Sequence, residues 1–150
     1  MVTVIEKLEE HVKYLPGKFL ALGRETIDRK TNPDKWSKKE ILGHLVDSAI
    51  NNLQRLIRLQ YEPGVKIVYN QVEWVRIQDY QNQDAENVVQ LWLSLNRQFI
   101  QVLKNFPSEL LDRKIDTGKV GPELHSAEFL ITDYLAHLEL HLRQIFTTAD

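Results

Sequence analysis

Hydrophobic residues recur at spacings of three and four over four long stretches of the chain, the pattern that places side chains on one face of an α-helix. These stretches are residues 2–14, 37–61, 85–105 and 126–147. Each combines one apolar face with a polar remainder, so each is expected to bury one side against the others. The pattern predicts an all-α protein, and the natural packing of four such helices is a four-helix bundle.

The beginnings and ends of three of these helices carry clear signals. Ser37-Lys38-Lys39-Glu40 has the form of a capping box, in which the serine hydroxyl and the glutamate carboxylate each bind a free backbone amide. Pro63-Gly64 is expected to stop the helix that begins there. Asp84 and Ser126 are the expected N-caps of the third and fourth helices.

The segments between the helices are less regular. Pro16-Gly17 is expected to interrupt the first helix, with a second short piece near residues 18–22. The polar segment 24–35 predicts a loop. The remaining predictions are an extended or loop segment at 65–68, one or two helical turns at 72–80 with Trp74 and Ile77 buried, and an irregular segment at 112–125 with room for a short pair of strands.

Length and composition bound the class of protein. The chain of 150 residues predicts one domain, spanning 1–150. The net charge of −2 argues against general nucleic-acid binding. The sequence has no run of about 18 apolar residues, so no membrane span is expected. The start of the chain lacks the apolar region of a secretory signal. With no cysteine, disulfides and thiolate ligands are excluded, and a cytoplasmic protein is expected.

Two histidines in the last predicted helix are the first candidates for chemistry. His137 and His141 are four residues apart, which places their Cβ atoms about 5–6 Å from each other on one helix face. At that spacing two imidazoles can share a divalent ion. The alternative is one histidine at the edge of the core and one on the surface. A third ligand elsewhere in the chain would decide between them.

The second predicted helix offers such a ligand. Opposite its apolar face lies a stripe of mostly short polar groups with one histidine, instead of the usual lysine and glutamate mixture: His44, Asp47, Ser48, Asn51, Arg55 and Arg58. This stripe either faces water or lines a cleft. His11, among charged neighbours in the first helix, is expected to be a solvated surface residue.

Three segments together resemble the DinB-like (YfiT-type) superfamily. Residues 36–49 (WSKKEILGHLVDSA) resemble the entry to its second helix, residues 69–80 the segment before its third helix, and residues 133–145 its last helix. The resemblance covers nearly the whole chain in the right order. It implies an up-down-down-up four-helix bundle. It also implies a divalent metal, usually nickel or zinc, on three histidines, which by position are His44, His137 and His141.

The resemblance also implies a range of functions. Members of the superfamily include thiol-dependent transferases, damage-inducible proteins and proteins regarded as metal-dependent hydrolases. The expected partners are a small-molecule substrate and a low-molecular-weight thiol. A homodimer is a further expectation, since relatives often dimerise and residues 65–68 would leave an apolar surface. One departure is Leu140, where close relatives often have a histidine.

The chemistry of a three-histidine site follows from the ligands. Three neutral imidazoles leave at least one coordination position open, as in catalytic rather than structural zinc sites. The bound ion can lower the pKa of water toward about 7 or hold a thiolate. A His-Glu-x-x-His metalloprotease motif is absent because position 138 is Leu138, and Glu139 is expected to point away from the histidines.

Other residues are assigned to the same cleft. Asp47 is the candidate catalytic residue, either as a general base or as the carboxylate that orients a ligand imidazole. His125, just ahead of the last helix, could reach the cleft mouth, but the interpretation as an ordinary loop residue is favoured. The candidates for binding the substrate in the cleft are Asn51, Arg55, Gln71 and Tyr134.

Two classes of function remain open at this point. The first is an enzyme, a metal-dependent thiol S-transferase or hydrolase. The second is a non-catalytic bundle that binds metal and serves as a stress or interaction protein. Metal-dependent turnover of an electrophile with a thiol, or of an ester or amide, separates the two classes.

Overall fold

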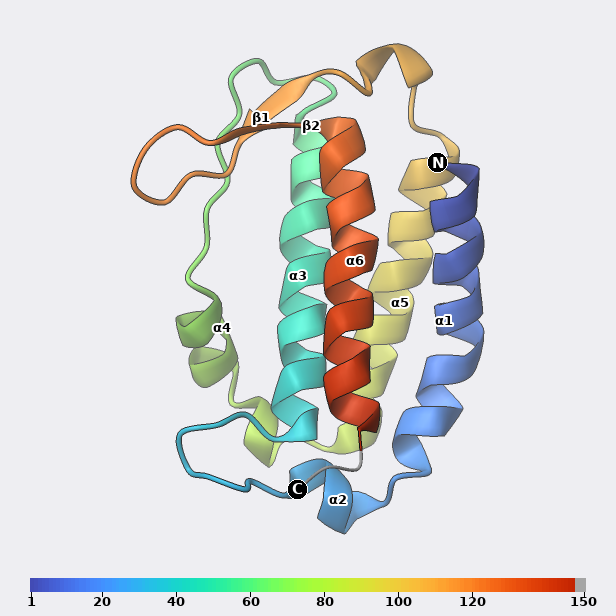
Figure 1. Cartoon of the computed structure of the whole chain (residues 1–150), viewed down its shortest axis with the longest axis vertical. Helices are drawn as coiled ribbons and strands as arrows, with labels where there is room; N and C mark the ends of the chain where they lie inside the picture. Colours follow the sequence, from blue (N-terminus) through green and yellow to red (C-terminus); the bar gives the residue numbers. More distant parts are fainter. Residues whose placement is uncertain (148–150) are drawn as a thin grey trace.

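The computed structural model describes residues 1–147 and contains the four long helices (Figure 1). Their bounds are α1 (Val2–Leu20), α3 (Lys38–Arg58), α5 (Ala85–Lys104) and α6 (Ala127–Phe146). The shorter elements are α2 (Arg24–Asp28), α4 (Gln71–Gln78), the 3-10 helices η1 (Tyr80–Asn82) and η2 (Ser108–Leu110), and the strands β1 (Lys114–Asp116) and β2 (Leu124–Ser126). The predicted all-α four-helix bundle is confirmed.

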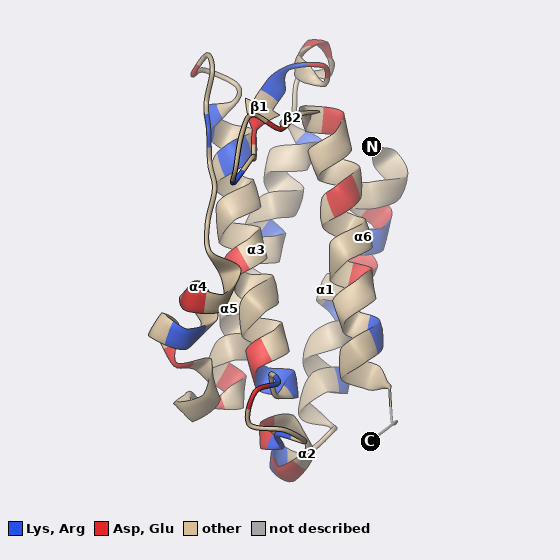
Figure 2. Cartoon of the chain, turned by 60° about the vertical axis from the view of Figure 1, so that its left-hand side comes forward, with Lys and Arg blue, Asp and Glu red and all other residues tan. Residues whose placement is uncertain are grey.

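The four helices run up-down-down-up, as the resemblance implied. In Figure 1, α1 and α6 begin at the top of the bundle, whereas α3 and α5 begin at the bottom. Two consecutive long helices can be parallel only if the chain between them returns to its starting end. Residues 59–84 make this crossover, and Figure 2 shows its helix α4 on the outer side of α3. The antiparallel pair α3 and α6 is in direct contact.

The predicted caps account for where the long helices begin. The Ser37 hydroxyl accepts a hydrogen bond from the Glu40 amide at 3.1 Å, and the Glu40 carboxylate accepts one from the Ser37 amide at 3.1 Å. Asp84 and Ser126 accept bonds from backbone amides of the first turns of α5 and α6. These side chains satisfy donors that a helix start leaves free.

The first helix differs from its prediction. Helix α1 continues through Pro16 and ends at Leu20, and Gly17 does not adopt a positive φ. A proline inside a helix costs one hydrogen bond, but the side chains on either side of this one, Leu15 and Phe19, are almost fully buried. Their burial offsets the local cost. The predicted loop at 24–35 is also wrong in part, since residues 24–28 form α2 and bury Ile27.

The crossover also departs from its prediction in two places. The buried residue of α4 is Val75, while Trp74 is only half-buried and Ile77 is 67% exposed, so the predicted buried pair is wrong. Residues 65–67 run alongside β1, with backbone hydrogen bonds to Asp116, and Val65 and Ile67 are buried within the chain itself. The apolar surface on which the expected homodimer rested is therefore not there.

A two-stranded hairpin lies at the top of the bundle in Figure 1. Strands β1 and β2 pair antiparallel, which confirms the short strand pair expected in segment 112–125. Acidic and basic residues are interspersed over the bundle in the view of Figure 2. None of the helices within residues 1–147 has the length and apolar character needed to cross a membrane.

Candidate metal centre

The structure brings His44, His137 and His141 together. His44 lies in the second turn of α3, and the other two lie in the C-terminal half of α6, which runs antiparallel beside it. One ring nitrogen from each histidine falls in a group whose members are all within 4.8 Å of one another. The Nε2 atoms of His44 and His137 are 3.1 Å apart.

Burial favours the neutral form of two of these imidazoles, those of His44 and His137. His44 is 1% exposed, and this burial, together with the charges that His137 and His141 would carry, lowers its pKa to about 3. Burial and then His141 lower the pKa of His137, against a smaller opposing effect of Asp133. Neutral imidazole is the form that binds metal through a nitrogen lone pair. The site is therefore electrostatically ready for a cation at neutral pH.

The donor set fits a divalent transition metal. Two nitrogens bound to one zinc ion at about 2.0–2.1 Å in tetrahedral geometry lie about 3.3 Å apart, close to the separation seen between His44 and His137. Gln144 contributes to the fit: its Oε1 lies 2.8 Å from His141 Nδ1. An amide oxygen only accepts, so Nδ1 donates and Nε2 keeps its lone pair. Imidazole ligands of this kind suit zinc and nickel.

Asp47 is fully buried near this cluster. Its Oδ1 accepts hydrogen bonds from the Tyr80 hydroxyl and from Gln78 Nε2, each at 2.7 Å, and burial raises its pKa. Burial and the Asp47 contact also raise the pKa of Tyr80, which therefore remains a donor. Asp47 Oδ2 and His44 Nδ1 are both buried without a hydrogen-bond partner among residues 1–147.

A glycine makes room for this network. A Cβ atom on Gly43, in the middle of the first half of α3, would lie 2.2 Å from Cδ2 of the Tyr80 ring. Real Cβ atoms essentially never approach another heavy atom so closely, so the ring packs directly against the helix backbone. No local signal in the sequence indicates a role for Gly43, Gln78 or Tyr80 in this network, because residues 78 and 80 reach α3 only through the crossover.

A cavity of about 350 Å³ adjoins the cluster between α3 and α6. Its lining includes Arg55, Tyr69, His125, Asp133, Tyr134 and His137. Helices α3 and α6 supply four of these residues, the crossover supplies Tyr69 and β2 supplies His125. The polar stripe of α3 thus lies in or beside a cleft, and the alternative of a solvated face is wrong for its first four members, which are buried.

The predicted cleft residues divide into two groups. Arg55, Tyr134 and His125 line the cavity, although the Tyr134 hydroxyl is engaged with Asn96 at 2.6 Å. Asn51 is buried outside the lining and donates to the Asp47 carbonyl at 2.9 Å. Gln71, at the exposed start of α4, does not line the cavity either.

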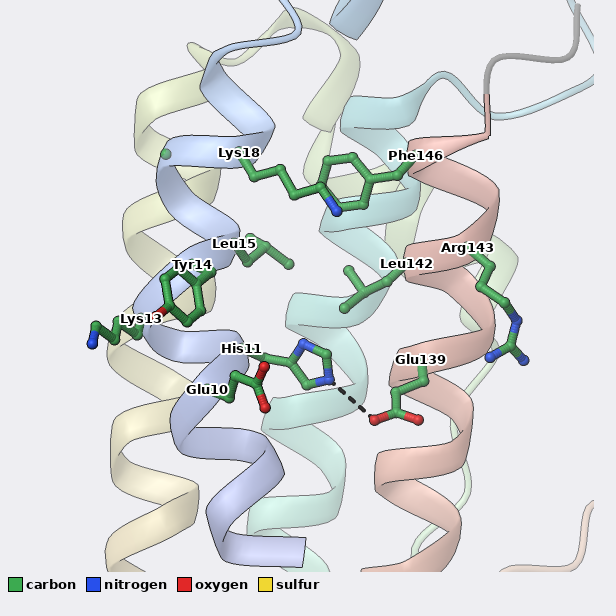
Figure 3. A pocket seen from close by; sticks show the side chains of 11 residues that line it. Glu10, His11, Lys13, Tyr14, Leu15, Lys18, Glu139, Leu142, Arg143 and Phe146 are labelled. Carbon is green, nitrogen blue, oxygen red and sulfur yellow. Dashed lines mark hydrogen bonds and ion pairs between the residues drawn. The ribbon is translucent and has the colours of Figure 1, made fainter.

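A larger hollow lies elsewhere, as a groove of about 930 Å³ between α1 and α6 (Figure 3). His11 Nε2 and Glu139 Oε1 meet across it at 3.1 Å, and the side chains of Leu15 and Leu142 face each other further along. The expectation of a solvated His11 is wrong, since the residue is half-buried and paired. The groove holds no metal-ligating cluster of described residues.

Comparison with known proteins places this arrangement in a family. The sequence profile of the DinB superfamily matches residues 7–145. The chain belongs to the DinB superfamily. The match covers all of α3 and α5, most of α1 and α6, and the three histidines, so the resemblance read from the sequence is confirmed.

Two relatives of this DinB-superfamily protein are informative. A protein of Oceanobacillus iheyensis, named "Putative metal-dependent hydrolase", is 24% identical over 118 residues, covering 78% of this chain and 68% of its own. The structure of YfiT from Bacillus subtilis, described as a probable metal-dependent hydrolase with an unusual four-helix bundle topology, matches with a TM-score of 0.82. That match has 19% identity and covers 95% of this chain and 82% of YfiT. It establishes the shared fold.

Proposed function

We propose that this DinB-superfamily protein is a metal-dependent enzyme of the hydrolase or thiol S-transferase type that acts on a small molecule. In this proposal His44, His137 and His141 hold one divalent ion, nickel or zinc. The observation that carries the proposal is the meeting of three ring nitrogens within 4.8 Å, from two helices, beside a cavity. The names of the two relatives, both described as metal-dependent hydrolases, point in the same direction.

The division of labour follows from the donor set. An ion on three imidazoles retains a position for water or a thiolate and supplies a nucleophile at neutral pH. Burial keeps the His44 and His137 rings unprotonated, and Gln144 fixes which nitrogen of His141 is free. The cavity that His137 helps to line holds the substrate. Both reaction types use this arrangement.

We assign Asp47 to positioning His44, not to general-base catalysis. The carboxylate is fully buried and does not line the cavity, so a substrate there does not contact it. Its Oδ2 and the His44 Nδ1 are unpartnered groups on adjacent turns of α3, and a hydrogen bond between them would satisfy both. Such a bond fixes the imidazole with Nε2 available for the metal.

This assignment has its own test. Replacement of Asp47 by asparagine should weaken metal binding about 10–100-fold, as loss of a partner that orients a ligand typically does. A general base would instead lower the turnover rate and leave the metal affinity unchanged. Isothermal titration calorimetry with zinc, compared between wild type and Asp47→Asn, separates the two roles.

The metal centre is tested on protein purified without a histidine tag. Wild type should contain about one nickel or zinc ion per chain, measured by inductively coupled plasma mass spectrometry. His44→Ala, His137→Ala and His141→Ala should each lose most of the zinc affinity while keeping a helical circular dichroism spectrum, since the apolar helix faces do not depend on them. His11→Ala is the matched control, a histidine on the other side of α6. Equal binding by wild type and His44→Ala would refute the assignment.

Catalysis is tested separately from binding. Wild-type protein loaded with nickel or zinc should hydrolyse p-nitrophenyl acetate, or accelerate the displacement of bromide from monobromobimane by a thiol such as 2-mercaptoethanol. His141→Ala should do neither. Stoichiometric metal binding without turnover of either kind would favour the second class of function, a bundle that binds metal without catalysis.

A further inference from the structure

Arg55 presents an unneutralised positive charge to the cavity beside His137. Its Nη2 donates to the Ile67 carbonyl at 2.8 Å and its Nη1 to Asn52 Oδ1 at 3.3 Å. Its Nε is buried and has no hydrogen-bond partner among residues 1–147. A guanidinium has five N–H donors, so, besides the buried Nε–H, one N–H on each terminal nitrogen remains unused. The Tyr69 ring lies 5.8 Å from the guanidinium carbon, but no carboxylate of the described chain lies within ion-pair distance of Arg55, and a charge taken out of water without an opposite charge is costly.

Asp133 presents the opposite charge to the same cavity. It lies on α6, one turn before His137, and its exposed carboxylate makes no hydrogen bond or ion pair with residues 1–147. It lines the same cavity as Arg55 and His137, and its charge acts to raise the pKa of both. One wall of the cavity therefore offers free donors on a cation, and the other offers free acceptors on an anion.

We propose that this cavity binds an α-amino acid group, with its carboxylate on Arg55 and its ammonium on Asp133. A simple acid would use Arg55 but would be repelled by Asp133, and a simple amine would leave Arg55 unpaired. A group with both charges satisfies both walls through charge-assisted hydrogen bonds. A cavity of about 350 Å³ admits an amino acid with its side chain.

The position of His137 connects this group to the chemistry. His137 lines the same cavity, so the side chain of the bound amino acid lies toward the three histidines. The substrate class is then a small molecule in which an amino acid group anchors the reacting part. That last step rests on the proposed function, whereas the binding of the amino acid group does not.

The test uses three ligands of matched length on metal-free protein, where an amino acid cannot chelate a bound ion. L-norvaline carries both charges, pentanoate only the carboxylate and butylamine only the ammonium. Binding is followed by two-dimensional amide NMR. Wild type should bind norvaline about tenfold or more tightly than either partial ligand, because it gains a second charge-assisted contact.

The variants give a crossed pattern. Arg55→Gln should weaken the binding of norvaline and of pentanoate about tenfold and leave the binding of butylamine unchanged. Asp133→Asn should weaken the binding of norvaline and of butylamine and leave the binding of pentanoate unchanged. Arg58→Gln, which removes a cation of the same helix paired with Glu62 outside the cavity, should change none of them. If Arg55→Gln does not fold, as loss of amide signal dispersion would show, Asp133→Asn still tests the proposal. Asp133 is exposed and makes no hydrogen bond or ion pair with residues 1–147, so its replacement should leave the fold intact.

Failure of this inference is distinguishable from failure of the proposed function. The amino acid site would be refuted if norvaline bound no more tightly than pentanoate or butylamine, or if Arg55→Gln and Asp133→Asn both left norvaline binding unchanged. This holds even if the three histidines bind zinc. Crossed losses in a protein that takes up no metal would instead support the amino acid site and overturn the proposed function.

Discussion

Replacement of Gly43 by alanine should destabilise this protein, whereas the same replacement at Gly17 should stabilise it. Both glycines lie inside long helices and neither has a positive φ. Alanine is better than glycine in a helix by about 0.5–1 kcal/mol, so both sites should gain this amount. The difference is steric. A Cβ on Gly17 would meet nothing within 4 Å, but on Gly43 it would lie 2.2, 2.4 and 2.6 Å from three atoms of the Tyr80 ring.

The magnitude at Gly43 follows from the displacement that the ring must make. Carbon atoms pack at about 3.5–4.0 Å, so Tyr80 must shift by about 1 Å or more. Overpacking of this kind costs about 1–3 kcal/mol, and the shift also breaks the 2.7 Å hydrogen bond from the Tyr80 hydroxyl to Asp47. After the gain in helix propensity, Gly43→Ala should lower the free energy of unfolding by about 1–3 kcal/mol.

Urea unfolding followed by circular dichroism measures both variants against wild type. The pair is self-controlled, since the chemical change is identical and only the neighbour differs. In a Tyr80→Leu background the added Cβ should cost much less, because the ring is gone. If Gly43→Ala gains as much stability as Gly17→Ala, the Tyr80 ring is not held against α3 and the account of the Asp47 network is wrong.

Three further outcomes are expected. In metal-free protein the free energy of unfolding should fall as the pH drops from about 6.5 toward 3, and His44 should contribute up to about 1.4 kcal/mol per pH unit to this fall. Urea unfolding at pH 7 and pH 5 should show a smaller fall for His44→Asn than for wild type. The sign follows because the unfolded chain takes up a proton near pH 6.5, whereas buried His44 does not until about pH 3. Ser37→Ala removes the N-cap of α3, which should cost about 1 kcal/mol of stability and so lower the thermal unfolding midpoint. His11→Ala, which removes the contact with Glu139, should cost less than about 1 kcal/mol in the same urea assay.

Hydrophobic periodicity and helix-capping residues were sufficient to predict most of the fold. Helices α3, α5 and α6 begin where Ser37, Asp84 and Ser126 predicted, because a cap is a contact between near neighbours in sequence. The break at Pro16 was predicted from an equally local rule and is wrong. The burial of Leu15 and Phe19, which depends on the rest of the bundle, is not visible in the sequence around Pro16.

The candidate metal ligands and their surroundings differ in how far the sequence could predict them. His137 and His141 are neighbours by helix geometry alone. His44 is indicated by its place in the polar stripe of the second helix, and the family resemblance adds it to the ligand set. Tyr80 reaches Asp47 only after the crossover has turned back along α3, so no local spacing indicates that contact. Asn51 shows the limit of a helical stripe: it shares a face with Arg55 but lies too deep in the bundle to reach the cavity.

The crossover that makes α3 and α5 parallel has a consequence for how this scaffold can change. The three histidines and Arg55 come from long helices, whose replacement would disturb the core. Tyr69 and His125, in contrast, come from connecting segments, and such segments accept insertions and exchanges more readily than helices do. Evolution could therefore retune what enters the cavity by changing residues 68–70 or 117–125 while the histidine cluster stays in place. Grafting these two segments between relatives is the corresponding route for engineering a new selectivity.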